Sequence, residues 1–149
     1  MNLENDIDKI SKNIYLGNFN GTQNIINNNS NIDVIINFYK YKHQLIDNVH
    51  YYHIPYSFKT ISIDECWIVI KKIIQITNNH RDQNILFCCK RGHHRSACAV
   101  LLYLILNNNC EYEIGETHIR NIRKKALNRK GNMPLALKYY SKLINRIYV

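Results

Sequence analysis

The sequence predicts an α/β fold in which a mostly parallel central sheet is flanked by helices on both faces. Short β-branched runs alternate with longer segments of helical periodicity through the first two thirds of the chain, an order typical of parallel strands joined by helical crossovers. The chain has 149 residues, which suits a single domain spanning 1–149. In such folds, ligands bind past the carboxyl ends of the strands.

Strands are expected where compact apolar runs are ended by turn residues. In chain order they cover Ile14–Gly17, Asp33–Asn37, Tyr51–Ile54 and Ile85–Cys88. Helices are expected where apolar residues recur at helical spacing. They cover Thr22–Asn28, Asp64 to about Thr77, Ser96–Leu106, Glu113–Leu127 and Leu135–Tyr148.

Three local features complete this map. Asp64 is interpreted as the N-cap of the second helix. Arg120, Arg123 and Lys124 are expected on the outward face of the fourth helix. The first dozen residues carry few packing cues, so they are expected to form either a flexible arm or a contact with a partner.

Composition limits the class of protein. The net charge of +9 predicts attraction to anions, without choosing among phosphoproteins, nucleic acids and acidic lipids. The five cysteines are an odd number and no secretory leader is recognisable, so free thiols in a reducing, cytoplasmic or otherwise intracellular, compartment are expected. The longest apolar run, Ala97–Leu106, is about half of the ~20 residues that a membrane span needs. No membrane partner is therefore expected, and the oligomeric state stays open.

The segment ILFCCKRGHHRSA, from Ile85 to Ala97, concentrates the chemistry of the chain. Cys88, Cys89, His93 and His94 are all zinc-ligand types, but structural zinc sites place paired ligands two to four residues apart with a long segment between the pairs. Adjacent residues that leave a strand point in opposite directions. No metal and no other cofactor is therefore expected.

The same segment favours a phosphate site. Cys89 and Arg95 are separated by five residues, a spacing that is weak evidence alone and gains weight from its context. A strand delivers Cys89, Gly92 allows a tight bend, and a helix starts directly after Arg95. Backbone N–H groups at a helix N-terminus bind anions, and Arg95 can hold two phosphate oxygens. The predicted phosphate-binding residues are Cys89, Lys90, Arg91, Gly92, His93, His94 and Arg95.

The positive field of such a loop lowers the pKa of a cysteine at its start. A thiolate beneath a bound phosphoryl group is placed for in-line attack, which gives a phosphocysteine intermediate. Cys89 is the candidate nucleophile because it alone has the spacing to Arg95, whereas Cys88 points the other way. Ser96 can donate a hydrogen bond to the sulfur and make it a better leaving group.

This segment resembles the signature loop of the cysteine-dependent dual-specificity phosphatases, His-Cys-x-x-Gly-x-x-Arg-Ser/Thr. The similarity extends to Ile14–Asn18, Asp33–Asn37, Tyr52–Pro55 and Trp67, and more loosely to Asn132–Pro134. The resemblance implies a sheet of four to five strands with flanking helices. It also implies a shallow pocket for phosphotyrosine, often for phosphoserine or phosphothreonine, and no need for a metal.

Two positions depart from the family pattern. Cys88 stands where the family usually has a histidine, so the pKa of Cys89 is expected to be lowered less than in relatives that keep it. Phe58 stands where the family has its general-acid aspartate, between Ser57 and Lys59. Asp64 is then the candidate catalytic acid, although its role as a helix cap competes with this hypothesis.

General acid catalysis is typically worth ~10²–10⁴ in rate, and a poor leaving group needs it most. A phenolate needs the proton less than a serine alkoxide, so the sequence favours phosphotyrosine on a phosphorylated protein partner. A diphosphate leaving group barely needs it, which keeps an RNA 5′-triphosphatase, or another polyphosphate phosphatase, as an alternative. A third hypothesis is a pseudophosphatase that binds phosphorylated partners without turnover.

Overall fold

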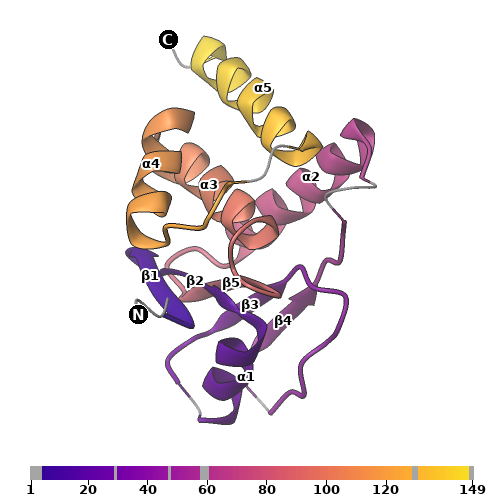
Figure 1. Cartoon of the computed structure of the whole chain (residues 1–149), viewed down its shortest axis with the longest axis vertical. Coiled ribbons are helices and arrows are strands. Elements are labelled where there is room, and N and C mark those ends of the chain that lie inside the picture. Colours follow the sequence, from indigo (N-terminus) through magenta and orange to yellow (C-terminus); the bar gives the residue numbers. More distant parts are fainter. Residues whose placement is uncertain (1–4, 29, 47, 58–60, 129–130, 148–149) are drawn as a thin grey trace.

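The computed structural model describes residues 5–28, 30–46, 48–57, 61–128 and 131–147, without the side chains of 143–147. A five-stranded sheet has the order β1-β2-β5-β3-β4 (Figure 1). Its strands are β1 (Ile7–Ser11), β2 (Ile14–Asn18), β3 (Val34–Asn37), β4 (His50–His53) and β5 (Ile85–Cys89). The helices are α1 (Phe19–Asn27), α2 (Ile63–Asn79), α3 (Arg95–Asn107), α4 (Tyr112–Ile122) and α5 (Asn132–Ile147). The α/β class is as predicted.

The predicted sheet needs a correction at its edge. β2, β5, β3 and β4 pair in parallel, but β1 pairs antiparallel with β2, so the sheet is mixed. The residues that form β1 belong to the first dozen, which were expected to be a flexible arm or a partner contact. A short turn reverses the chain before β2, with Asn13 at a φ of 67°, a conformation that asparagine tolerates.

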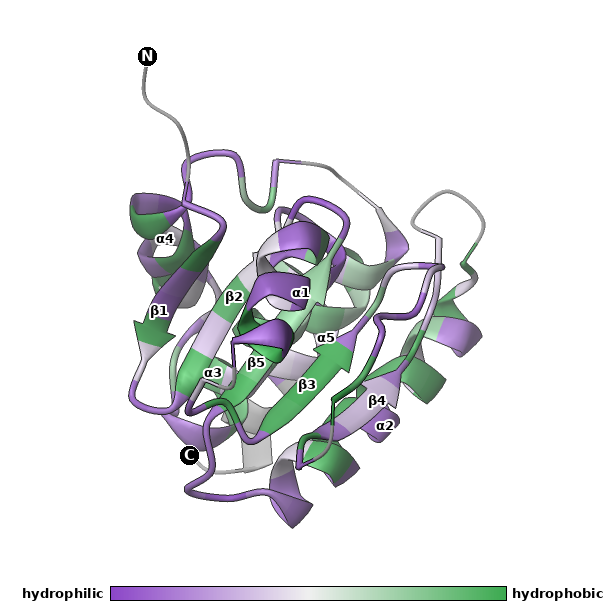
Figure 2. Ribbon diagram, turned by 90° about the horizontal axis from the view of Figure 1, so that it is seen from below, coloured by the Kyte–Doolittle hydropathy of each residue, from purple (hydrophilic) through white to green (hydrophobic). Residues whose placement is uncertain are grey.

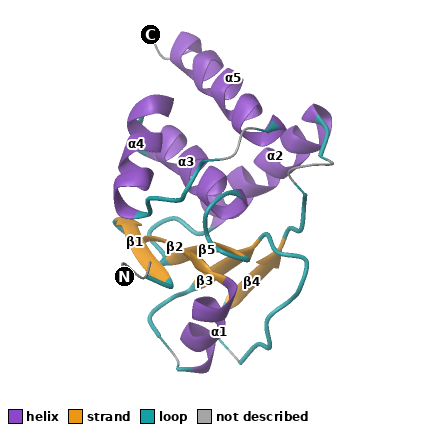
Figure 3. Cartoon of the chain, viewed as in Figure 1, coloured by secondary structure: helices purple, strands orange, loops and turns teal. Residues whose placement is uncertain are grey.

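Helices cover both faces of the sheet, unequally. α1 lies on one face, and α2, α3, α4 and α5 lie on the other (Figure 3). The strands are strongly apolar where they are covered on both faces, as Figure 2 shows for β3 and β5. Alternate residues of β5 enter two separate cores: Phe87 and Cys89 pack in the large core under α3, while Leu86 and Cys88 pack in the smaller one on the other face. This confirms the prediction that Cys88 and Cys89 point in opposite directions.

The start of α2 differs from the prediction. Ser62, not Asp64, is the N-cap, and its hydroxyl accepts a hydrogen bond from the Glu65 N–H at 3.1 Å. The Ser62 hydroxyl also donates to the Glu65 carboxylate at 3.3 Å. Asp64 is an exposed residue of the first turn, where its negative charge favours the helix N-terminus.

α4 ends at Ile122, five residues before its predicted end, and this changes the surroundings of Arg123. Arg120 does face outward, and it pairs with Glu116 at 3.7 Å. Arg123 was expected beside it but is 1% exposed, so that prediction is wrong. Arg123 is the residue at which the helix ends, and its backbone turns the side chain under the loop that follows β5.

No helix among the described residues is both long and apolar enough to span a membrane.

Candidate active site

Cys89 and Arg95 stand at the two ends of one short loop. Cys89 is the last residue of β5 and Arg95 the first residue of α3, so the loop runs from a buried strand into a helix N-terminus. It opens on a pocket of about 550 Å³. The described residues that line the pocket are Lys40, Pro55, Tyr56, Ser57, Cys89, Lys90, Arg91, His93, His94 and Arg95. The structure thus brings together the predicted phosphate-binding residues, of which Gly92 is buried and does not line the pocket. Ser96 is also buried, next to Cys89.

The sulfur of Cys89 lies 3.0 Å from the Ser96 hydroxyl, and the cysteine is 3% exposed. Burial by itself raises the pKa of this thiol. The Ser96 hydroxyl, the Ser96 N–H, the charge of Arg95 and the Gly92 N–H together outweigh burial, so that the pKa of Cys89 is lowered from its ordinary value. The loop therefore favours a thiolate at the position where the sequence predicts the nucleophile.

Cys88 has the opposite environment. It is fully buried in the small core, and burial raises the pKa of its thiol far above the ordinary range. A hydrogen bond with Thr22 of α1 opposes this rise without cancelling it. Cys88 is therefore a neutral packing residue, in keeping with the sequence-based interpretation that it is a small buried side chain.

The loop carbonyl groups all have donors outside the loop. In an anion-binding loop the N–H groups must face the centre, so the carbonyls face outward and need partners. The donors are the Phe19 N–H to Lys90 O (3.2 Å), the Arg123 guanidinium to Arg91 O (3.0 Å) and Gly92 O (3.1 Å), the Leu127 N–H to His93 O (2.7 Å) and the Cys98 N–H to His94 O (2.8 Å). The loop is thus held in shape through its carbonyl groups.

Gly92 meets two requirements that another residue would fail. Its φ is +71°, in the left-handed region that glycine adopts without strain. A Cβ atom there would lie 2.6 Å from the backbone of Gly17 on β2. The middle of the loop therefore packs backbone against backbone.

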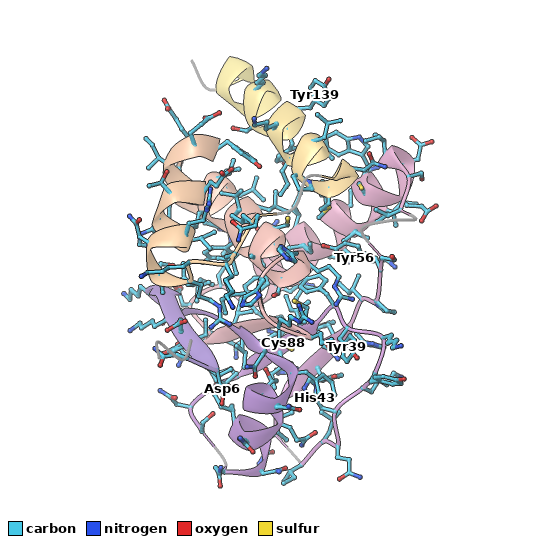
Figure 4. The ribbon with its side chains drawn as sticks, in the orientation of Figure 1. Asp6, Tyr39, His43, Tyr56, Cys88 and Tyr139 are labelled. Carbon is cyan, nitrogen blue, oxygen red and sulfur yellow. The ribbon has the colours of Figure 1, made fainter. Side chains whose placement is uncertain are left out.

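The side chain of Arg95 is fixed by the segments that follow β3 and β4. One terminal nitrogen donates to the carbonyl oxygens of Phe38 and Tyr56, both at 3.4 Å. The guanidinium also lies over the Tyr39 ring, 5.5 Å from its centroid, within the range of a cation–π contact. Figure 4 labels Tyr39 and Tyr56 on these segments. These contacts preorganise Arg95 at the pocket.

No carboxylate lines the pocket among the described residues. Asp64, the candidate acid, is exposed on α2 and does not line the pocket. Phe58 and Lys59 lie outside the described residues. Within the described part of the chain, no group of three or more histidine, cysteine, aspartate or glutamate side chains could hold a metal ion.

Sequence reasoning missed three contributors to this site. Lys40 lines the pocket from a loop that carries no motif of its own, so nothing in the sequence ties it to Cys89. Tyr56 also lines the pocket, directly after the Tyr52–Pro55 segment, but the resemblance gives its position no role. Arg123 supports the loop by donating hydrogen bonds to the carbonyls of Arg91 and Gly92. The sequence placed Arg123 inside a helix predicted to run to Leu127, whereas the helix ends at Ile122, so its burial was not foreseen.

Known proteins resemble this chain in structure but not in sequence. No family model matches the sequence, and no curated protein matches it significantly. Solved structures do match: DUSP15 at 21% identity and a TM-score of 0.78, over 95% of this chain and 93% of that one. Human DUSP28 matches at 11% identity and a TM-score of 0.77, over 96% of this chain and 97% of that one. OH1 from the Orf virus, described as a tyrosine phosphatase, matches at 18% identity and a TM-score of 0.71, over 91% of this chain and 86% of that one.

The chain has the fold of the dual-specificity phosphatases. This confirms, at the level of the fold, the resemblance seen in the signature loop. The dual-specificity phosphatase fold accounts for the five strands, the helices on both faces and the loop at the carboxyl end of β5.

Proposed function

We propose that this protein is a phosphatase that hydrolyses phosphate monoesters on proteins, with phosphotyrosine favoured and phosphoserine or phosphothreonine possible. The observation that carries the proposal is the placement of Cys89. Its buried sulfur lies beside the Ser96 hydroxyl, receives N–H groups of the loop and faces the charge of Arg95. The folds of DUSP15, human DUSP28 and the Orf virus tyrosine phosphatase support the same class.

The proposed reaction has two steps. The Cys89 thiolate attacks phosphorus, a sulfur–phosphorus bond forms, and the bond to the leaving oxygen breaks. Water then attacks the phosphocysteine, inorganic phosphate leaves, and the sulfur departs as a thiolate stabilised by Ser96. In both steps the loop N–H groups and Arg95 hold the phosphoryl oxygens. No cofactor takes part.

The lack of a carboxylate in the described lining of the pocket supports the preference for phosphotyrosine. The leaving oxygen must depart with little help from an acid, and a phenolate, with a conjugate acid pKa of about 10, does so more readily than an alkoxide. Asp64, the acid candidate from the sequence, does not line the pocket, so the proposal does not depend on it.

One observation favours a second candidate, an RNA 5′-triphosphatase or another polyphosphate phosphatase. The charged residues that line the pocket in the described chain are cations, namely Lys40, Lys90, Arg91 and Arg95. Such a lining suits a substrate with more charge than a monoester, and its diphosphate leaving group needs no acid.

The proposal also places the protein in a reducing, intracellular compartment. All five cysteines are free thiols, and the nucleophile must stay reduced to act.

A substrate panel separates these functions. Wild type, Cys89→Ser and the control Cys88→Ala are assayed on p-nitrophenyl phosphate, phosphotyrosine and phosphoserine peptides, and triphosphate-ended RNA. We expect hydrolysis of the aryl phosphates, lost only in Cys89→Ser. Activity that survives in Cys89→Ser refutes the mechanism. Turnover of RNA alone supports the second candidate, and tight phosphopeptide binding without any turnover supports a pseudophosphatase.

A further inference from the structure

Arg123 is a buried cation that the proposed chemistry does not use directly. Its side chain is 1% exposed. Nε donates to the Gly92 carbonyl at 3.1 Å, and one terminal nitrogen donates to the Arg91 carbonyl at 3.0 Å. A buried guanidinium is costly unless its charge is paired and its donors are used, so a fold that keeps one here gains something from it.

The other side of the same guanidinium faces strand β1. Its second terminal nitrogen lies 2.8 Å from the Asp8 carboxylate and also donates to the Asn5 carbonyl at 2.7 Å. The Asp8 side chain is 11% exposed, so this ion pair is poorly screened by solvent. Arg123 therefore joins two segments more than eighty residues apart in the sequence, the N-terminal segment with β1 and the loop that follows β5.

The middle of the loop depends on this side chain more than its ends do. The carbonyls of Lys90, His93 and His94 accept hydrogen bonds from backbone N–H groups, which the fold holds in place. The carbonyls of Arg91 and Gly92 accept from Arg123. The orientation of these two peptide groups decides whether the neighbouring N–H groups face a bound anion.

We propose that Arg123 is a positioning residue for the signature loop, and that Asp8 holds it there, so that the edge strand β1 sets how tightly the loop binds phosphate. The inference rests on the proposed function only in taking phosphate as the ligand of the loop. Arg123 touches neither substrate nor sulfur in this scheme, because it acts through the carbonyls of Arg91 and Gly92.

The test measures anion binding instead of turnover. Inorganic phosphate and orthovanadate protect Cys89 from iodoacetamide, and the protection gives an apparent Kd for each anion. The variants are Arg123→Met, Arg123→Lys and Asp8→Asn, and the matched control is Arg120→Met, an exposed arginine one helical turn away. The pH dependence of alkylation and the Tm are measured on the same samples.

We expect Arg123→Met to weaken phosphate binding about tenfold to a hundredfold, the loss of two hydrogen bonds from a charged donor. Asp8→Asn keeps the shape and an acceptor but removes the charge, so we expect a weakening of roughly threefold to tenfold. Both variants also move the alkylation inflection of Cys89 to higher pH. We expect the phosphate Kd of Arg123→Lys to lie between those of wild type and Arg123→Met. We expect the phosphate Kd of Arg120→Met to match that of wild type.

A purely structural role predicts a different pattern. If folded Arg123→Lys and Asp8→Asn lose Tm but keep the wild-type anion Kd and inflection, the proposal is overturned. If Arg123→Met does not fold, Asp8→Asn and Arg123→Lys decide the question. A wild type that binds phosphate without hydrolysing any ester contradicts the proposed function alone, because this test needs no turnover.

Discussion

Cys88 and Cys89 are neighbours in the sequence, yet they occupy two different chemical environments. Both are buried, and burial raises the pKa of each thiol. Cys88 lies in the small core, where a single hydrogen bond with Thr22 leaves that rise in place. Cys89 lies at the start of the loop that follows β5. There the hydrogen bonds of Ser96 and Gly92 and the charge of Arg95 outweigh burial and lower the pKa of the thiol.

The donors around each sulfur, and not its exposure, therefore account for the opposite directions in which the two pKa values move. A strand makes the contrast possible, because successive side chains point to opposite faces of the sheet. One sulfur can then pack in the small core while the next receives the donors of the loop. Four predictions test this contrast, ordered by the size of the effect.

The largest effect is expected from removing the Cys89 sulfur, with removal of the Cys88 sulfur as the comparison. Cys89→Ala should lower kcat/KM for p-nitrophenyl phosphate by on the order of 10⁴-fold or more, because the covalent step is lost. Cys88→Ala should change kcat/KM less than about threefold and lower the free energy of unfolding by about 1 kcal/mol, the cost of a small cavity. Steady-state kinetics and urea unfolding measure the two. Equal losses of activity in both variants would contradict the contrast.

Arg95→Lys should give the next largest effect. Lysine keeps the charge but cannot hold two phosphate oxygens in one plane, and it loses the contact with Tyr39. We expect kcat/KM to fall about 10²–10³-fold. Arg81→Lys, an exposed arginine in the turn after α2, serves as the control and should match wild type. A fall of less than about threefold in Arg95→Lys would mean that charge alone is sufficient.

Ser96→Ala should shift the pH at which Cys89 becomes reactive. In wild type, the pKa of Cys89 is lowered from its ordinary value, so iodoacetamide reactivity falls at a lower pH than it does for an ordinary free thiol. Removing the Ser96 hydroxyl removes the largest favourable contribution, so the fall should occur at higher pH. Alkylation rates across pH measure this, with Thr117→Ala on α4 as the control. An unchanged inflection would assign the lowered pKa to Arg95 and the backbone.

The smallest effect is expected from Asp64→Asn. Asp64 is exposed and does not line the pocket, so kcat/KM for phosphotyrosine peptide should change less than about twofold. The loss of its charge at the N-terminus of α2 should cost about 0.3–1 kcal/mol of stability. A fall of about 10²-fold or more on phosphoserine peptide would instead identify Asp64 as the general acid.

The sequence alone identified the parts of the site that are continuous in the chain. The strand, the spacing from Cys89 to Arg95 and the start of the helix after it all lie within thirteen residues, and local patterns predict such segments well. The alternation of β5 also predicted the opposite directions of Cys88 and Cys89, which the two cores confirm.

The parts that were missed depend on contacts between distant segments. β1 is a five-residue edge strand with mixed polarity, and its pairing with β2 gives no strong periodicity. Arg123 continues the helical pattern of α4, so only tertiary contact with Arg91 and Gly92 reveals that it is buried. Ser62 and Asp64 are both good N-cap residues two positions apart, and the choice between them depends on where the helix begins.

The contact between Gly92 and Gly17 has a consequence for how this protein can change. Two main chains touch there with no side chain between them, so no rotamer can absorb a shift of one against the other. Movement of β2 by a few tenths of an ångström would pass directly to the loop between Cys89 and Arg95. Lys40 and Lys90, exposed at the rim, carry no such constraint. Side chains at the rim of the pocket can therefore be replaced more easily than Gly92 or Gly17 beneath it.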